Sequence, residues 1–258
     1  MIELEKCKEI FLEYVNNYDT SDFIISRKIG HTMGVLNIST EIAKSLNLSN
    51  EEVDLASLIG LLHDIGRFEQ ARISGTYKDS EKVNHATIGV EILFNENKIK
   101  EFLPNTREYD DIVKNAVYEH NKLKIKEGLT DKELLFAKII RDADKLDIYR
   151  LFLLDNVMAM GTDSGFTDTT HFSKEVLEAF YNNSQLPKNN LKTMLDWFLN
   201  SIAFTYDINF KKSFEILKER NYINQIIDIG INLWKEQTEE FEKIRIHIND
   251  YIKNKIIV

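Results

Sequence analysis

Apolar residues recur along most of the chain at intervals of three and four residues, the spacing of one face of an α-helix. This spacing predicts helices over residues 2–18, 23–48, 50–63, 81–97, 107–122 and 131–154, and four more within residues 171–258. Two polar segments that contain glycine interrupt the pattern, at residues 66–80 and 155–170. We expect the first segment to be irregular and the second to be a mobile loop or lid, because turn-forming residues are frequent there.

The scarcity of chain-breaking residues supports this helical interpretation. Of the 258 residues, only 10 are glycine and 2 are proline, and such a composition argues against many-stranded β architectures. No internal repeat and no linker rich in glycine, serine or proline separates one part of the chain from another. The fold class is therefore predicted to be all-α, with one domain over residues 1–258 that includes a C-terminal helical extension at about residues 171–258.

Charge, cysteine content and hydropathy limit the partners and the location. The net charge of −9, from 33 basic and 42 acidic residues, disfavours a nucleic-acid polymer as partner, since its phosphates require basic patches. The single cysteine, Cys7, excludes a disulfide framework and a cysteine zinc cage, and it favours a reducing, cytoplasmic location. No apolar run approaches 18 residues and no signal-peptide core is present, so we expect no membrane partner.

The strongest local signal for chemistry is a histidine beside an aspartate at the end of an apolar run. In the stretch LLHDIG, residues 61–66, apolar residues lead up to His63 and Asp64, and a glycine then interrupts the helix. Burying Asp64 is costly unless a cation compensates its charge. A divalent metal ion is the natural compensation, because neutral imidazole and carboxylate are preferred ligands of transition metals.

Two further titratable residues lie in apolar helical surroundings. His31 stands between apolar residues of its helix, and Asp144 lies in a segment rich in leucine and isoleucine. A His-Asp pair taken alone is more often a surface pair or a helix C-cap. The combination of four such residues instead predicts a metal site formed by His31, His63, Asp64 and Asp144.

In this order, His31, the HDIG motif at residues 63–66 and Asp144 resemble the HD superfamily of metal-dependent phosphohydrolases. The resemblance covers about residues 25–155 and implies an HD core, a helical bundle, over that range. The family pattern places the last metal ligand at Asp144, with Asp142 as the alternative.

Two more histidines extend the resemblance, His85 and His120. Members of the family that hold two metals place histidines in these intervals, which implies a binuclear centre. Asp64 would bridge the two ions. The first ion would be bound by His31, His63 and Asp144, and the second by His85 and His120. Single-metal members instead use such histidines to contact the substrate phosphate, and both could also be ordinary helix histidines. One or two divalent ions are expected, with Mn, Fe, Co, Ni, Zn and Mg all open.

The resemblance implies a phosphomonoesterase or phosphodiesterase acting on a nucleotide or another small phosphorylated substrate. A metal-activated hydroxide would attack phosphorus, with Asp64, Arg67 and Lys145 as catalytic residues. Arg67 and Lys145 are also expected to bind the phosphate, although Lys145 is equally typical of a solvated helix. Asp147 and Arg150 share a helix face with the last metal ligand, and they would line the substrate pocket or pair with each other.

Alternatives to this function remain open at the level of sequence. The acidic pair of the (p)ppGpp-hydrolysing branch is replaced here by Gly66-Arg67, and the GYP-type signature of the cyclic dinucleotide branch is missing after His120. The same ligand set occurs in di-iron oxygenases of the HD fold, and a non-catalytic metal-binding or ligand-binding module is a further alternative. Six ligands for two ions leave coordination positions open, which favours an enzyme. The C-terminal helices could cover the site, form a homodimer face or bind a partner.

Overall fold

The computed structural model describes residues 2–76, 78–80, 82–154, 166, 168, 170–185 and 187–257. Those residues form helices and contain no strand, which confirms the all-α prediction. The chain divides into two compact units, residues 1–147 and 148–258. The boundary falls inside one helix, and not in the predicted loop at residues 155–170, most of which lies outside the described residues. The organisation of the whole chain as one domain stays a prediction.

The first unit carries the helices that precede the boundary. They are α1 (Leu4–Val15), α2 (Phe23–Ser45), α3 (Asn50–Leu62), α4 (Gly66–Ser74), α5 (His85–Val90) with a π-helical turn η1 (Glu91–Asn95), α6 (Ile99–Phe102), α7 (Asp110–Glu119) and α8 (Asp131–Leu154), which crosses into the second unit.

The prediction of an irregular segment at residues 66–80 is wrong for its first part, where α4 forms. The helix has few apolar residues, but Phe68 and Gln70 are both fully buried. A buried glutamine counts as polar in a hydrophobic pattern, so the inward face of α4 was hidden from the sequence analysis. The predicted helix at residues 81–97 begins later, at His85, where the Asn84 side chain accepts hydrogen bonds from the backbone of the first turn.

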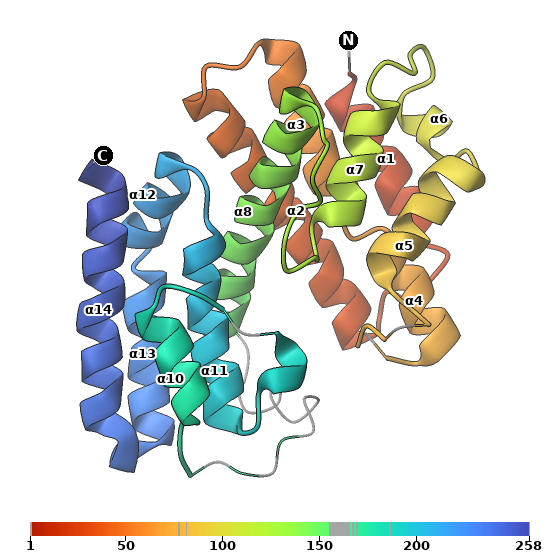
Figure 1. The fold of residues 1–258 in the computed structure, drawn as a ribbon. Coiled ribbons are helices and arrows are strands. Elements are labelled where there is room, and N and C mark those ends of the chain that lie inside the picture. Colours follow the sequence, from red (N-terminus) through yellow and green to blue (C-terminus); the bar gives the residue numbers. More distant parts are fainter. Residues whose placement is uncertain are drawn as a thin grey trace. The chain divides into compact units, whose positions relative to one another are not determined.

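Helices α2 and α3 pack side by side and form the centre of the first unit (Figure 1). Ser49 caps α3 through a reciprocal pair of contacts with Glu52. The remainder of α3 is buried on nearly every side, with Leu55, Leu58 and Leu61 fully inaccessible. Gly60 allows this approach, because a β-carbon there would lie 2.8 Å from the Cα of Leu36. The helix therefore ends deep in the core, and it delivers the HDIG motif to the interior.

The second unit contains five described helices after α8, one more than predicted. They are α10 (Lys174–Tyr181), α11 (Met194–Ile202), α12 (Lys211–Glu219), α13 (Tyr222–Leu233) and α14 (Thr238–Ile257), with short 3-10 turns η2 (Lys188–Asn190), η3 (Ala203–Asp207) and η4 (Lys235–Gln237). Only Arg220 and Asn221 separate α12 from α13, and Asn221 adopts a left-handed φ of 52°. Hydrophobic spacing does not reveal so short a break. None of the described helices is both long and apolar enough to cross a membrane.

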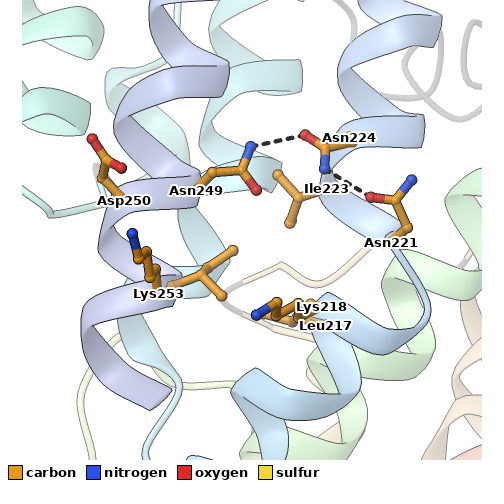
Figure 2. Close-up of a pocket in the computed structure, with 9 residues that line it drawn as sticks. Leu217, Lys218, Asn221, Ile223, Asn224, Asn249, Asp250 and Lys253 are labelled. Atoms are coloured by element: carbon orange, nitrogen blue, oxygen red, sulfur yellow. Dashed lines mark hydrogen bonds between the residues drawn. The ribbon is translucent and has the colours of Figure 1, made fainter. Parts of the chain in front are cut away.

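A pocket of about 240 Å³ lies between α12, α13 and α14. Figure 2 shows Asn221, Asn224 and Asn249 joined along it by hydrogen bonds of 2.7 and 2.8 Å. A second pocket, of about 270 Å³, lies in the first unit beside Cys7 and Tyr109. None of the six predicted metal ligands lines either pocket.

Candidate metal centre

Five helical segments of the first unit bring the six predicted metal ligands together. Helix α2 carries His31, the end of α3 is followed by His63 and Asp64, α5 begins at His85, α7 is followed by His120, and α8 carries Asp144. All four histidines are almost completely inaccessible, and Asp64 is 3% exposed. These residues are separated by up to 113 positions in the chain, so only tertiary packing assembles them.

Asp64 lies between two groups of histidines, with one carboxylate oxygen toward each. Its Oδ2 is 3.7 Å from Nε2 of His31 and 3.7 Å from Nε2 of His63. Its Oδ1 is 3.2 Å from Nε2 of His85 and 3.5 Å from Nε2 of His120. In each group the ligand atoms lie within 4.8 Å of one another. This is the arrangement expected of a carboxylate shared by two metal sites.

Asp144 completes the first of the two groups. Its Oδ1 lies 3.0 Å from Nε2 of His31 and 3.7 Å from Nε2 of His63. Asp142, the alternative ligand, is fully buried. We call the set of His31, His63, Asp64 and Asp144 the His31 site, and the set of Asp64, His85 and His120 the His85 site.

Backbone carbonyls orient two of the imidazole rings. Nδ1 of His63 lies 2.8 Å from the Gly60 oxygen, and Nδ1 of His120 lies 2.7 Å from the Val117 oxygen. A carbonyl oxygen only accepts hydrogen bonds, so Nδ1 must carry the proton in both rings. The lone pair of each ring is therefore on Nε2, which faces Asp64.

Carboxylates orient the other two rings in the same sense. Nδ1 of His31 lies 2.7 Å from Oδ2 of Asp147. Nδ1 of His85 lies 2.7 and 2.9 Å from the two oxygens of Asp79. A carboxylate behind a histidine fixes its tautomer and makes Nε2 a better metal ligand. All four rings thus present Nε2 to the centre.

The donor atoms fit divalent metal ions and are poorly satisfied without them. Nε2 of His63 is buried and has no hydrogen-bond partner, which is costly for a polar atom. Nε2 of His85 lies 2.9 Å from Nε2 of His120, although both rings already donate through Nδ1. In neutral rings, two lone pairs at that distance would repel each other, and a cation bound by both nitrogen atoms would convert the repulsion into attraction. Imidazole nitrogen and carboxylate oxygen together suit Mn, Fe, Co, Ni and Zn.

The two carboxylates of the centre are held in the ionised form. Burial acts to raise the pKa of Asp64, but the Lys28 ammonium and other basic neighbours lower that pKa well below its usual range. Burial also opposes ionisation of Asp144, yet its contact with His31 and the other histidines lowers the pKa of Asp144. Ionised carboxylates are the form that binds metal.

The protein environment shifts the pKa values of His63 and His85 in one direction and that of His31 in the other. Burial lowers the pKa of His63 to about 4 and that of His85 to about 3, because an apolar interior disfavours the imidazolium ion. Burial also acts to lower the pKa of His31, but the carboxylates of Asp144 and Asp147 raise it above its usual value. His63 and His85 are therefore neutral at pH 7, as metal ligands must be.

Two basic side chains reach the centre from its edge. Nε of Arg67 lies 3.4 Å from Oδ1 of Asp64, and its side chain is 16% exposed. Lys28, which the sequence analysis missed, places Nζ 2.8 Å from Oδ2 of Asp64 with its side chain 21% exposed. Lys28 is three residues before His31 on α2, so both lie on one face of the helix. That spacing was the signal that could have identified Lys28.

The other residues predicted to line the substrate pocket or to bind phosphate are Asp147, Lys145 and Arg150. Asp147 is fully buried behind His31, where it orients a predicted metal ligand, and its predicted place in the substrate pocket stays a prediction. Lys145 is 8% exposed, and its Nζ lies 3.4 Å from the Arg141 carbonyl oxygen. Arg150 belongs to the second unit. The phosphate contact predicted for Lys145 and the place in the substrate pocket predicted for Arg150 stay predictions.

Comparison with known protein families agrees with this geometry. Residues 29–149 match the model of one family, described as the HD domain, which confirms the family that the motifs indicated. The matched segment contains all six predicted ligands and Arg67. No curated protein and no solved structure gives a significant match.

Proposed function

The chain contains an HD domain over residues 29–149, and we propose that this domain is a metal-dependent phosphohydrolase. The observation that carries the proposal is the division of the Asp64 oxygens between the His31 site and the His85 site. A carboxylate shared in this way suits a pair of divalent ions. Bound there, such ions supply Lewis acidity toward a phosphoryl oxygen and lower the pKa of coordinated water.

The basic side chains at the edge of the centre support a phosphorylated substrate. Lys28 and Arg67 each lie within 3.4 Å of an Asp64 oxygen, and both are partly exposed. A guanidinium can contact a phosphate through two N–H groups, and an ammonium adds a point charge. Lys28 and Arg67 would therefore hold the phosphate against the metal ligands and orient its phosphorus atom.

The substrate class that we propose is a nucleotide or another small phosphorylated compound. The acidic character of the chain, with a net charge of −9, disfavours a nucleic-acid polymer, whose binding needs extended basic surfaces. Only the local cluster of Lys28 and Arg67 is needed to attract a compact phosphate group. Both monoesters and diesters fit this description.

The test combines metal analysis with an activity screen. Protein purified without oxygen or chelator should contain one or two divalent ions per chain, and it should release phosphate or a phosphomonoester from members of a nucleotide and sugar-phosphate panel. Asp64→Ala should lose both the metal and the activity while its helical circular dichroism stays intact. Metal retained in that variant would contradict the assignment.

The same six ligands also fit a di-iron oxygenase, and the experiment separates the two enzymes. Two irons per chain with substrate-dependent oxygen consumption, and without phosphate release, would establish the oxygenase and overturn our proposal. Bound metal with neither activity would instead indicate a binding module.

A further inference from the structure

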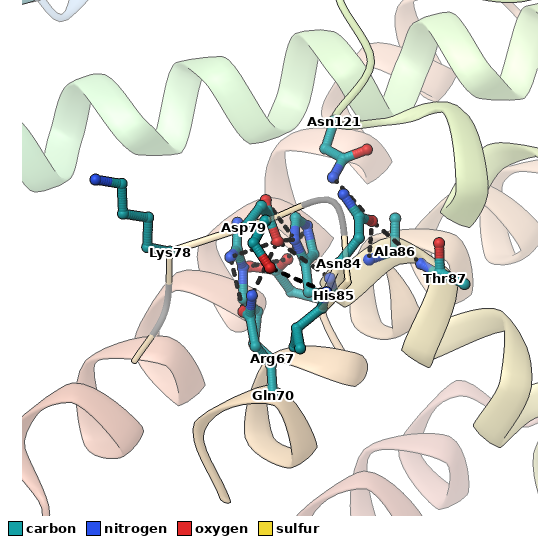
Figure 3. A network of polar contacts seen from close by, with 12 residues as sticks. Arg67, Gln70, Lys78, Asp79, Asn84, His85, Ala86, Thr87 and Asn121 are labelled. Carbon is teal, nitrogen blue, oxygen red and sulfur yellow. Dashed lines mark hydrogen bonds and ion pairs between the residues drawn. The ribbon is translucent and has the colours of Figure 1, made fainter. Parts of the chain in front are cut away.

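Asp79 lies in the segment between α4 and α5, and neither the motifs nor the sequence periodicity identify it. Its carboxylate contacts both the ring and the backbone of His85, since Nδ1 of the ring lies 2.7 and 2.9 Å from its oxygens and the backbone N–H of His85 donates to Oδ1 at 3.1 Å. Figure 3 shows Asp79 in the middle of this polar network, between His85 and Arg67. The Asp79 side chain is only 25% exposed.

We propose that Asp79 is the positioning residue of the His85 site. By accepting the Nδ1 proton of His85, it directs Nε2 of that ring toward Asp64 and toward a divalent ion. Loss of the Asp79 carboxylate should therefore weaken the ion at the His85 site and leave the ion at the His31 site in place. This inference rests on the metal centre of the proposed function.

The position of His85 in its helix explains why a side chain is required. His63 and His120 follow the ends of α3 and α7, so each donates to a carbonyl oxygen three residues earlier in its own helix. His85 is the first residue of α5, and no preceding turn of that helix offers a carbonyl oxygen. A free N-terminal turn has unsatisfied N–H groups instead. An acceptor for Nδ1 must come from outside α5, and Asp79 supplies it.

Asp79 is also connected to α4, which raises an alternative route for its effect. Oδ1 accepts a hydrogen bond from Nε2 of the fully buried Gln70 at 3.0 Å and lies 3.4 Å from Nη1 of Arg67. Burial acts to raise the pKa of Asp79, but the hydrogen bond from His85 and the charge of Arg67 lower it, so the carboxylate is ionised. A variant at Arg67 can show whether the effect of Asp79 passes through His85 or through Arg67.

The experiment is a titration of the metal-free chain with Mn²⁺. Calorimetry measures the number of bound ions and their affinities, and electron paramagnetic resonance detects magnetic coupling between them. The wild-type chain should bind two ions, and their magnetic coupling should be visible in the spectrum. Asp79→Ala should bind the first ion normally and the second about 10–100-fold more weakly, the usual effect of removing a carboxylate behind a metal-bound histidine. With one equivalent of Mn²⁺ added, the electron paramagnetic resonance spectrum of Asp79→Ala should be that of isolated, uncoupled Mn²⁺. Asp79→Asn keeps a hydrogen-bond acceptor but no charge, so its affinity for the second ion should lie between those of the wild-type chain and Asp79→Ala.

Three comparison variants make the result specific. Asp19→Asn removes another loop carboxylate of the first unit, one that accepts from Ser21 N at 3.0 Å and Ser21 Oγ at 2.6 Å, and it should bind two ions. Arg67→Gln should also bind two ions. His85→Ala should lose the second ion, and adding Asp79→Ala to that variant should change nothing further. Circular dichroism of each metal-free variant checks that it is folded.

Each contrary outcome has a definite meaning. If Asp79→Ala and Asp79→Asn bind two ions with wild-type affinity, the inference is overturned and the proposed function stands. The same holds if Arg67→Gln or Asp19→Asn also loses affinity for the second ion. A wild-type chain that binds one ion would overturn the inference and leave a single-metal hydrolase. A wild-type chain that binds none would overturn the proposed function and the inference with it.

Discussion

The carboxylate of Asp147 occupies the space that a β-carbon at position 34 would need, because such an atom would overlap Oδ1 of Asp147 where Gly34 has none. The two residues lie on α8 and α2. Asp147 in turn accepts the Nδ1 proton of His31 at 2.7 Å, and His31 is one turn before Gly34 on α2. The glycine thus provides the space in which a buried carboxylate can orient a predicted metal ligand.

We predict that Gly34→Ala weakens metal binding at the His31 site. The added methyl group must displace Asp147, and His31 then loses the acceptor that fixes its tautomer. Loss of such an acceptor typically lowers metal affinity by about 10–100-fold. Metal content after dialysis against a defined free-ion concentration measures the change.

Gly30→Ala is the matched control for this prediction. Gly30 lies one turn earlier on the same helix, and a β-carbon there would meet no atom within 4 Å. Replacing a helical glycine by alanine without a clash stabilises a protein by about 0.4–1 kcal/mol. Gly30→Ala should therefore unfold at a higher urea concentration and retain its metal. A similar loss of metal in both variants would contradict the role of Gly34.

We predict that Lys28→Met reduces turnover without removing metal. Lys28 contacts Asp64 at 2.8 Å and is proposed to hold the substrate phosphate. A hydrogen bond to a charged group contributes about 1.5–3 kcal/mol, so kcat/KM should fall by about 10–100-fold. Metal content should stay the same or rise, because the ammonium competes with a cation for the same carboxylate.

Lys44→Met tests whether any lysine of α2 has this effect. Lys44 is exposed in the last turn of the helix, and its removal should leave kcat/KM unchanged. Metal loss in Lys28→Met would show that Lys28 supports the centre and does not serve the substrate.

We predict that Gly66→Ala destabilises the first unit and disturbs His85. A β-carbon at position 66 would overlap the carbonyl oxygen of His85 and lie 2.5 Å from the backbone nitrogen of Gly89. Both atoms belong to the backbone of α5, so α4 and α5 must separate. Overpacking of this kind costs about 1–3 kcal/mol, which urea unfolding of the metal-free protein can measure. Unfolding at the wild-type urea concentration would show that α5 shifts without cost.

Metal ions should stabilise the folded chain measurably. Without them, the ionised carboxylates of Asp64 and Asp144 are buried near each other around His31, and like charges repel. An ion present at 100 times its Kd adds about 2.7 kcal/mol to the free energy of unfolding. Chelator should lower the melting temperature of the wild-type protein and have no effect on Asp64→Ala. A chelator effect of equal size in that variant would place the ion elsewhere.

The sequence alone was sufficient for the helical class and for the six residues that the structure brings together in the candidate metal centre. Helical spacing is a local property, so α2, α3 and α8 were predicted close to their observed ranges. The ligands carry a chemical signature of their own, since a histidine or aspartate in an apolar helix needs compensation wherever the helix packs. The HDIG motif and the ordered series of histidines therefore indicated the metal centre before any contact was known.

Only the tertiary structure determined which residues support those ligands. Asp147 is 116 positions from His31, and it shares a helix face with Asp144, so the sequence equally allowed a place in the substrate pocket. Asp79 has no motif, and an ordinary polar residue in its position would look the same. A hydrogen bond between side chains from different segments depends on how those segments pack, and hydrophobic spacing carries no information about that. The space beside Gly34, which admits Asp147, exists only because α2 and α8 meet there.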